Sequence, residues 1–482
     1  MTTQPGRESF PFDRRTSALP PLVRLLTATA SALLVFAAAV SAQPASPARP
    51  PAPLPATVPS SPETSQLSAE ARLAAEVEAH LRQQILAPVF PRIVDRRPQG
   101  GGFFQEYDRQ WRQQPDRQRT LVYQARMTWA AGRIAADRPD LRDRYREFAR
   151  HGARFLTRVL WDREGGGGFH WRVGADFRPD LGHPKLMYGQ AFGLYALAAA
   201  YAGTGDREWL DAAIDAYRWI ERHARDTTHG GYFESLDRDG RRRGTPGIPG
   251  PGWPEGVKTS NTTLHVLEAY IELYAVWPDD QLRKDLLALV ELFRDRIILD
   301  TGHLGDQFHD DWRVVSTQVS WGHDVEAAHL LLVAAGQLGL QDDTVLLEKC
   351  RRLVDLSLTN GWDDRLGGLY ENEPNLRRGV APGLKVWWPQ VEMLLALAMM
   401  HERYGRETSR YWDALQLQWR CITRQFTDPQ FPGRINSIGA DGRVDYRKLH
   451  EWKAIYHDVR GLLGTAEVLR RMSDRTSDQA TP

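Results

Sequence analysis

Cysteine is scarce in this chain, whose 482 residues include only Cys350 and Cys421. A single bridge cannot form a disulfide framework, and nothing around these two residues resembles a metal-binding set. We therefore expect two buried free thiols, with one disulfide as the alternative in an exported protein.

An excess of charge of one sign is also lacking. The formal net charge is +1, and 62 basic residues are interleaved with 61 acidic ones. This balance gives no electrostatic basis for binding nucleic acid, and we expect no nucleic-acid partner. The chain does hold 42% hydrophobic residues, enough for a large core, and 16 tryptophans. Tryptophan stacks on sugar rings but also fills ordinary cores, so composition alone does not decide between these roles.

The N-terminal region has the order of an export signal. A basic segment precedes the apolar run LLTATASALLVFAAAV (25–40), and small residues follow up to Ala42. That run is short for a membrane-spanning helix. We expect a cleaved signal at 1–42, a Pro/Ala/Ser-rich linker at 43–65, and no stable membrane insertion after cleavage. The expected location is outside the cytoplasm, in the periplasm; an uncleaved membrane anchor is the alternative.

Long alternating runs typical of β-strands are scarce as well. From residue 66 onward, apolar residues recur every three or four positions, as in GQAFGLYALAAAYAGTG (189–205) and EAAHLLLVAAGQLG (326–339). This period predicts helices. Both stretches are apolar on nearly every side, which indicates helices buried all round.

A glycine–aromatic loop recurs between the predicted helices. Examples are GGGGFHW at 165, GGYFESLDRDG at 230 and GGLYENE at 367, and the loop occurs six times at intervals of roughly 65 residues. Such an interval holds two helices and their loops. Six helical hairpins whose inner helices are buried all round favour a closed ring over an open solenoid. We predict an all-α (α/α)6 barrel in one domain at 66–475, with function in the loops at one end.

The stretch SWGHDVEAAHLL (320–331) carries the most chemistry. His323 and Glu326 are three apart and share a helix face, so the carboxylate can orient the imidazole for proton transfer. One alternative is that Asp324 and Glu326 only oppose the helix dipole at its N-terminus. A zinc pair is another, although the stretch lacks the H-E-x-x-H form.

The stretch VKTSNTTLHVLEAY (257–270) places Asn261 and His265 four apart on one face. The alternative is that Ser260 or Asn261 caps the helix and His265 is a satisfied core histidine.

In EWKAIYHDVRGLL (451–463), Trp452 precedes His457, and Arg460 follows His457 at helical spacing. These side chains could form one polar face of the last inner helix, or a solvated helix edge.

Three further candidates come from aromatic and cationic residues near helix starts. KVWWPQVEMLL (385–395) holds Trp388 and Glu392. Arg126 lies in the apolar stretch LVYQARMTWA, where a guanidinium needs an acidic or ligand partner, and Tyr188 begins another apolar helix. All these candidates lie at the starts of predicted inner helices, so their polar ends would meet at one mouth. Histidines, an arginine, carboxylates and tryptophans around one pocket suit proton transfer on a neutral polyol.

The ordered stretches YGQAFGLYALA, HGGYFE, KTSNTTLHVLEAY, DDWRVVS, SWGHDVEAAHLL, KVWWPQVE and EWKAIYHDVR resemble the N-acylglucosamine 2-epimerase superfamily, and within it the cellobiose 2-epimerases. The resemblance spans most of residues 70–472. It implies an (α/α)6 barrel without a metal or cofactor. It also implies reversible inversion at C2 of the reducing-end glucose in β-1,4-linked disaccharides, so the expected partner is a small disaccharide.

The resemblance also implies a role for each candidate. His323 and His457 would be the acid/base pair, and Arg126 would bind the oxygens at C1 and C2 of the opened sugar. His265, like Asn261, would contact the sugar or help ring opening, and Glu326 would support a histidine. The remaining residues would contact the substrate: Tyr188, Asn261, Trp388, Glu392 and Trp452. Thr263 and Ile455 depart from the usual family motifs, which bears on substrate positioning.

Three other functions remain open at this point. The same fold could carry a monosaccharide 2-epimerase or an aldose–ketose isomerase acting on N-acylglucosamine or mannose. A glycoside hydrolase or lyase would need paired carboxylates, for which Asp310, Asp311 and Asp324 are available. A sugar-binding module without turnover is the last alternative.

Overall fold

The computed structural model describes residues 67–97, 101–115, 118–244, 256–372 and 383–480. The expected signal and linker lie outside these residues. Within the described part of the chain, no helix combines the length and hydropathy needed to cross a bilayer.

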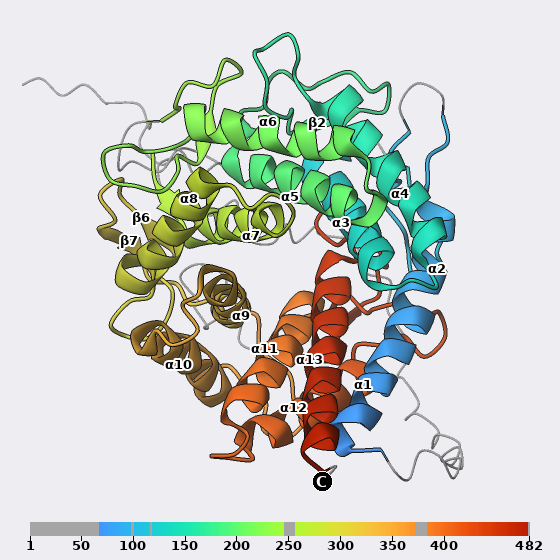
Figure 1. Cartoon of the computed structure of the whole chain (residues 1–482). Coiled ribbons are helices and arrows are strands. Elements are labelled where there is room, and N and C mark those ends of the chain that lie inside the picture. The colour runs from blue at the N-terminus through green and yellow to red at the C-terminus, as the bar shows by residue number, and fades with distance from the viewer. Residues whose placement is uncertain (1–66, 98–100, 116–117, 245–255, 373–382, 481–482) are drawn as a thin grey trace, which may run out of the picture.

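The helices form two concentric rings, as Figure 1 shows. Each inner helix alternates along the chain with an outer one, and α1 at the beginning packs beside α13 at the end. The predicted (α/α)6 barrel is therefore confirmed. The inner helices are α3 (Leu121–Asp137), α5 (Met187–Thr204), α7 (Ser260–Val276), α9 (Trp321–Leu338), α11 (Trp387–Tyr404) and α13 (Tyr456–Ala480). The outer helices are α1 (Ala69–His80), α4 (Arg142–Phe155), α6 (Arg207–His223), α8 (Asp280–Leu292), α10 (Thr344–Asn360) and α12 (Arg410–Arg424).

Short helical segments extend some outer helices. The first outer helix continues without a break from α1 through the π-helical turn η2 (Leu81–Leu86) into α2 (Ala87–Ile93). Two more π-helical turns, η3 (Leu156–Leu160) and η4 (Phe293–Ile297), follow α4 and α8 directly.

Burial separates the two rings as the sequence pattern predicted. Helix α5 is buried along nearly its whole length, whereas α6 buries one face with residues such as Trp209 and Tyr217. Small residues let the inner helices approach closely. A Cβ on Gly132 of α3 would lie 2.4 Å from the carbonyl oxygen of Ala199 on α5, so a larger residue there would push these helices apart.

Short antiparallel strands gather at the end of the barrel where the inner helices begin. Strands β1, β3, β5 and β8 each end one residue before an inner helix starts. The pairings are β1–β2, β3–β4, β5–β6–β7 and β8–β9–β10. The bounds are β1 (Gln118–Thr120), β2 (Arg172–Gly174), β3 (Lys185–Leu186), β4 (Ser235–Leu236), β5 (Lys258–Thr259), β6 (Gln307–Phe308), β7 (Val314–Ser316), β8 (Lys385–Val386), β9 (Ser437–Ile438) and β10 (Val444–Asp445).

A glutamine on an inner helix holds the recurring glycine–aromatic loop. The amide of Gln190 accepts from the backbone N–H of Phe169 (2.7 Å) and donates to its carbonyl oxygen (2.9 Å). The loop needs glycine because Gly168 has a φ of +74°, and a Cβ there would lie 2.7 Å from the Trp219 ring. Gln124 with Phe103 and Gln390 with Leu369 repeat the same paired bonds.

The two cysteines are buried free thiols, which confirms the expectation from their scarcity. Cys350 lies on α10 and Cys421 on α12, and burial raises the pKa of each thiol to about 12.

Candidate active site

The candidate residues lie at the strand-bearing end of the inner ring. Each is in the first two turns of its helix, except Trp452, which lies in the turn before α13. They are Arg126 on α3, Tyr188 on α5, Asn261 and His265 on α7, His323 and Glu326 on α9, Trp388 and Glu392 on α11, and His457 on α13.

Arg126 joins three of the predicted stretches. Its Nη2 donates to the hydroxyl of Tyr188 (2.8 Å), and its Nη1 donates to the backbone carbonyl of Trp452 (2.9 Å). The guanidinium lies over the rings of Phe192 (4.6 Å to the centroid) and Tyr456 (4.9 Å). These contacts fix a buried positive charge at the end of the inner ring.

His323 and His457 approach the same indole. The centroid of the Trp388 ring lies 4.9 Å from that of His323 and 5.2 Å from that of His457. The Nδ1 atom of His323 lies 2.8 Å from Ser320 Oγ, and Nδ1 of His457 lies 2.6 Å from Glu392 Oε1. In both rings Nδ1 is occupied, which leaves Nε2 for other chemistry.

His265 is held by a carboxylate on its own helix. Its Nδ1 lies 2.9 Å from Glu268 Oε2, and its ring packs against Tyr188 (5.0 Å between centroids) and Phe192 (4.7 Å). Tyr188 thus touches both His265 and Arg126, so α3, α5 and α7 contribute to one cluster.

Asn261 does not cap its helix. The cap of α7 is Thr259, whose Oγ1 accepts from the backbone N–H of Thr262 (3.1 Å). Among the described residues, Asn261 Oδ1 is buried without a hydrogen-bond partner. An unpaired buried oxygen at this end of the barrel is suited to accept from a substrate hydroxyl.

The sequence predicts that Glu326 can orient the His323 imidazole, but the hydrogen bond of that ring goes to Ser320. Glu326 Oε1 accepts from Arg460 and from the hydroxyl of Tyr456 (3.3 Å), while His323 takes Ser320 as its partner. Glu326 therefore acts on His323 only through its charge.

Arg460 bonds three buried carboxylates. It contacts Glu268 of α7 and Glu326 of α9, and its Nη2 lies 2.7 Å from Glu392 Oε1 of α11. The sequence indicated that Arg460 lies on a polar face of the last inner helix. The structure shows that this face meets the three carboxylates.

Burial and this ion cluster shift the pKa values of the site. Burial lowers the pKa of His323 to about 4, although the charge of Glu326 opposes this. Burial also lowers the pKa of His457, against the opposing effect of Glu392. For Glu392, burial raises the pKa, but Arg460, His329 and His457 together bring it well below its usual range.

Sequence reasoning missed Glu268, Tyr456 and His329. Glu268 stands three residues after His265, the same spacing that drew attention to His323 and Glu326, so a signal for it existed. His329 Nε2 lies 2.7 Å from Glu392 Oε2, across 63 residues of sequence, and no local spacing indicates that pair.

Two sets in this cluster have the side chains and spacing of metal ligands. Their candidate ligand atoms lie within 4.8 Å of one another in each set. Arg460 already bonds the carboxylates of both sets, so a cation would have to displace a guanidinium. The sets are His265, Glu268 and Glu326, and Glu326, Glu392 and His457.

The acids considered for glycoside hydrolysis have basic partners outside the histidine cluster. Asp324 is buried and accepts from His303 Nδ1 (2.7 Å). Asp310 pairs with Arg242 (2.7 Å), and Asp311 pairs with Arg313 (2.7 Å).

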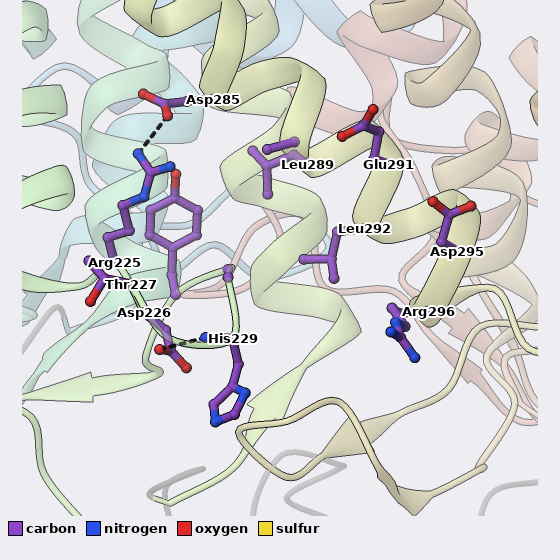
Figure 2. A pocket seen from close by; sticks show the side chains of 14 residues that line it. Arg225, Asp226, Thr227, His229, Asp285, Leu289, Glu291, Leu292, Asp295 and Arg296 are labelled. Carbon is purple, nitrogen blue, oxygen red and sulfur yellow. Dashed lines mark hydrogen bonds and ion pairs between the residues drawn. The ribbon is translucent and has the colours of Figure 1, made fainter.

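A pocket of about 340 Å³ lies elsewhere, between α8 and the loop that follows α6 (Figure 2). Two pairs of its polar groups bond each other: Arg225 Nη1 bonds Asp285 Oδ1 (2.5 Å), and the backbone N–H of His229 donates to Asp226 Oδ1 (3.1 Å). None of the residues that line this pocket belongs to the histidine cluster. The side chains suited to proton transfer are in the cluster, so we place the candidate active site there.

Comparisons with known proteins show which family the chain is similar to. A family model described as N-acylglucosamine 2-epimerase matches residues 102–460. The chain is 32% identical over 391 residues to a cellobiose 2-epimerase of Bacteroides fragilis, covering 80% of this chain and 96% of that protein. A cellobiose 2-epimerase of Dictyoglomus turgidum is 26% identical over 410 residues, covering 83% and 99%.

The fold is also similar to that of a solved cellobiose 2-epimerase. The structure of cellobiose 2-epimerase from Bacillus thermoamylovorans B4167 superposes with a TM-score of 0.73 at 27% identity, covering 82% of this chain and 99% of that one. The chain belongs to the N-acylglucosamine 2-epimerase family and is a carbohydrate epimerase, an enzyme of the isomerase class.

Proposed function

We propose that this enzyme inverts C2 of the reducing-end glucose in β-1,4-linked disaccharides, converting cellobiose to glucosyl-mannose. The observation that carries the proposal is the pair of imidazoles, His323 and His457, in contact with one indole, Trp388. Arg126 supplies a fixed positive charge in the same cluster. The names of the relatives support the substrate class.

The chemistry needs ring opening first, because the C2 hydrogen becomes acidic only beside the C1 aldehyde. One imidazole then takes the C2 proton through Nε2. The electrons of the C–H bond form a C1–C2 double bond, and charge moves onto the oxygen at C1. Arg126 stabilises this enediolate, as a preorganised cation can in a buried site. The second histidine enters this step as an imidazolium, delivers its Nε2 proton to the opposite face of C2 and becomes neutral, while the first histidine keeps the proton that it took. No metal takes part in this scheme.

Two bases distinguish epimerisation from isomerisation. A single base on one face would shuttle the proton from C2 to C1 and yield a ketose. His457 backed by Glu392 and His323 backed by Ser320 provide two separate proton carriers.

Trp452 supports a disaccharide over a monosaccharide. Its side chain is 37% exposed, and its ring centroid lies 6.1 Å from that of buried Trp171. Such an aromatic surface beside the cluster can stack on a second sugar ring, which a monosaccharide would leave unused.

The first test is turnover in deuterated water. Cellobiose should give glucosyl-mannose that carries deuterium at C2, because an imidazole exchanges its proton with solvent before delivery. Incubation with N-acetylglucosamine serves as the substrate control, and product chromatography resolves epimer, ketose and free monosaccharide. Unlabelled product would contradict the two-histidine scheme, and conversion of N-acetylglucosamine alone would replace the disaccharide assignment.

A further inference from the structure

Arg460 lies among the groups assigned to proton transfer, and its Nη2 is 3.5 Å from Nδ1 of His457. Its two terminal nitrogens meet Glu268, Glu326 and Glu392, which come from three different inner helices. All four side chains are buried. Removing one partner from such an ion cluster leaves an uncompensated buried charge.

Arg460 helps to orient the carboxylates of Glu392 and Glu268, and both carboxylates also contact histidines. Glu392 Oε1 lies 2.6 Å from Nδ1 of His457, and Glu392 Oε2 lies 2.7 Å from Nε2 of His329. Glu268 Oε2 lies 2.9 Å from Nδ1 of His265. The hydroxyl of Tyr456 also donates to Glu268 Oε2 (3.0 Å).

An ionised carboxylate can only accept hydrogen bonds. The facing Nδ1 atoms of His265 and His457 must therefore carry the hydrogen, and their Nε2 atoms keep the lone pair that a base needs. A protonated carboxyl could instead donate, and the tautomers would no longer be determined.

We propose that Arg460 is a positioning residue that keeps Glu268 and Glu392 ionised and thereby sets the Nδ1–H tautomers of His265 and His457. The inference rests on the proposed epimerase function for its kinetic consequence, but the tautomers themselves do not depend on turnover. The low pKa of Glu392 and the pKa of Glu268, lowered to about 2, agree with it, since in both carboxyls Arg460 offsets the effect of burial.

The pH dependence of the cluster involves charged and titratable groups from every inner helix around Arg460. These are Arg126 of α3, Tyr188 and Tyr195 of α5, His265, Glu268 and Glu272 of α7, His323, Glu326 and His329 of α9, Glu392 of α11, and Tyr456 and His457 of α13.

The test compares Arg460→Met with Arg460→Lys. Loss of the positive charge raises the pKa of every neighbouring group, so Arg460→Met should move the acid limb of kcat/KM for cellobiose upward by about one pH unit or more. Lysine keeps the positive charge but lacks the planar guanidinium. Arg460→Lys should therefore keep the acid limb near its wild-type pH, while kcat falls by about 10- to 100-fold and KM changes little.

Arg119→Lys is the matched control, because Arg119 is buried and pairs with Asp95 (3.2 Å) outside the cluster. The control should lose thermal stability without a shift of the limb.

The second measurement is the nitrogen NMR spectrum of ¹⁵N-histidine-labelled protein, which reads the tautomers without substrate. Glu268→Gln should disturb the Nδ1–H signature of His265 and leave that of His457 intact, and this variant answers the question even if Arg460→Met does not fold. Wild-type tautomers in Glu268→Gln, or a wild-type acid limb in a folded Arg460→Met, would overturn the proposal. If wild type fails to epimerise cellobiose while the spectra change as expected, the proposed substrate fails and the role of Arg460 stands.

Discussion

At the scale of single residues, burial sets the proton affinity of the two histidines assigned to proton transfer. It lowers the pKa of His323 to about 4, and it lowers that of His457 as well. A lowered pKa keeps an imidazole neutral as the pH falls, so the base form persists until the pH passes through that lower value. We expect the acid limb of kcat/KM for cellobiose below the ordinary histidine value of about 6.5.

The measurement is a pH–rate profile in constant ionic strength, with circular dichroism at each pH to exclude acid unfolding. Ser320→Ala serves as the companion variant, because it removes the Nδ1 partner of His323 and leaves the Glu392–His457 pair in place. An acid limb at or above pH 6.5 in the folded wild-type enzyme would show that neither imidazole is governed by burial.

Two histidine–glutamate pairs with the same spacing show what a local sequence pattern can and cannot predict about a site. His265 with Glu268 and His323 with Glu326 both stand three apart on an inner helix. Arg460 bonds both carboxylates, but Glu268 keeps its second oxygen on His265 (2.9 Å), whereas Glu326 makes no hydrogen bond to His323, whose Nδ1 meets Ser320. Spacing predicted a shared helix face for His323 and Glu326, and the same rule would have indicated His265 and Glu268. Spacing could not predict that Arg460, which lies much later in the chain, bonds both carboxylates.

At the scale of elements, buried lysines anchor the loops that the sequence showed as repeats. In four loops of the described part of the chain, a lysine bonds an aspartate and a loop carbonyl; Lys385, for example, reaches Asp363 (2.7 Å) and the carbonyl oxygen of Gly367 (2.7 Å). The glycine–aromatic repeat was predictable because it recurs in sequence, but the lysine partners were not, since they lie about 20 to 30 residues away. The other three pairs are Lys185–Asp162 (3.1 Å), Lys258–Asp226 (2.7 Å) and Lys448–Asp428 (3.0 Å).

Lys385 also stands two residues before Trp387, which begins α11 together with Trp388. Replacing Lys385 with methionine leaves Asp363 without its cation, which should lower the free energy of unfolding by about 3 kcal/mol. Urea denaturation followed by circular dichroism measures this change. The variant Lys385→Met with Asp363→Leu removes both charges and should recover much of the loss.

The control for this prediction is Arg313→Met, which breaks an exposed ion pair with Asp311. Exposed pairs contribute little, so its denaturation midpoint should match that of wild type. If Lys385→Met loses no more free energy of unfolding than this control, the lysine does not stabilise the loop. Gln390 and the glycines alone would then hold its shape.

At the scale of the whole molecule, the chain closes its ring by packing α1 beside α13, the helix that carries His457 and Arg460 (Figure 1). Helix α1 buries Leu73, Ala74 and Val77. The closed barrel was predictable from six repeats and from inner helices that are apolar all round. The partner of α13 was not, because contacts between the two ends of a chain leave no mark in local spacing.

Because α1 closes the ring, we expect it to be needed for activity. The proposed signal (1–42) and linker (43–65) should be dispensable for both folding and activity. Helix α1 has its own N-cap, since Ser68 Oγ accepts from the backbone N–H of Ala71 (3.1 Å). We expect a chain of residues 66–482 to be monodisperse and to epimerise cellobiose with wild-type kcat. A chain of residues 94–482 should lose activity and aggregate, because it exposes the apolar side of α13 to water. Size-exclusion chromatography and turnover measure both outcomes. Full activity in the shorter chain would show that the last inner helix holds His457 and Arg460 in place without its outer neighbour.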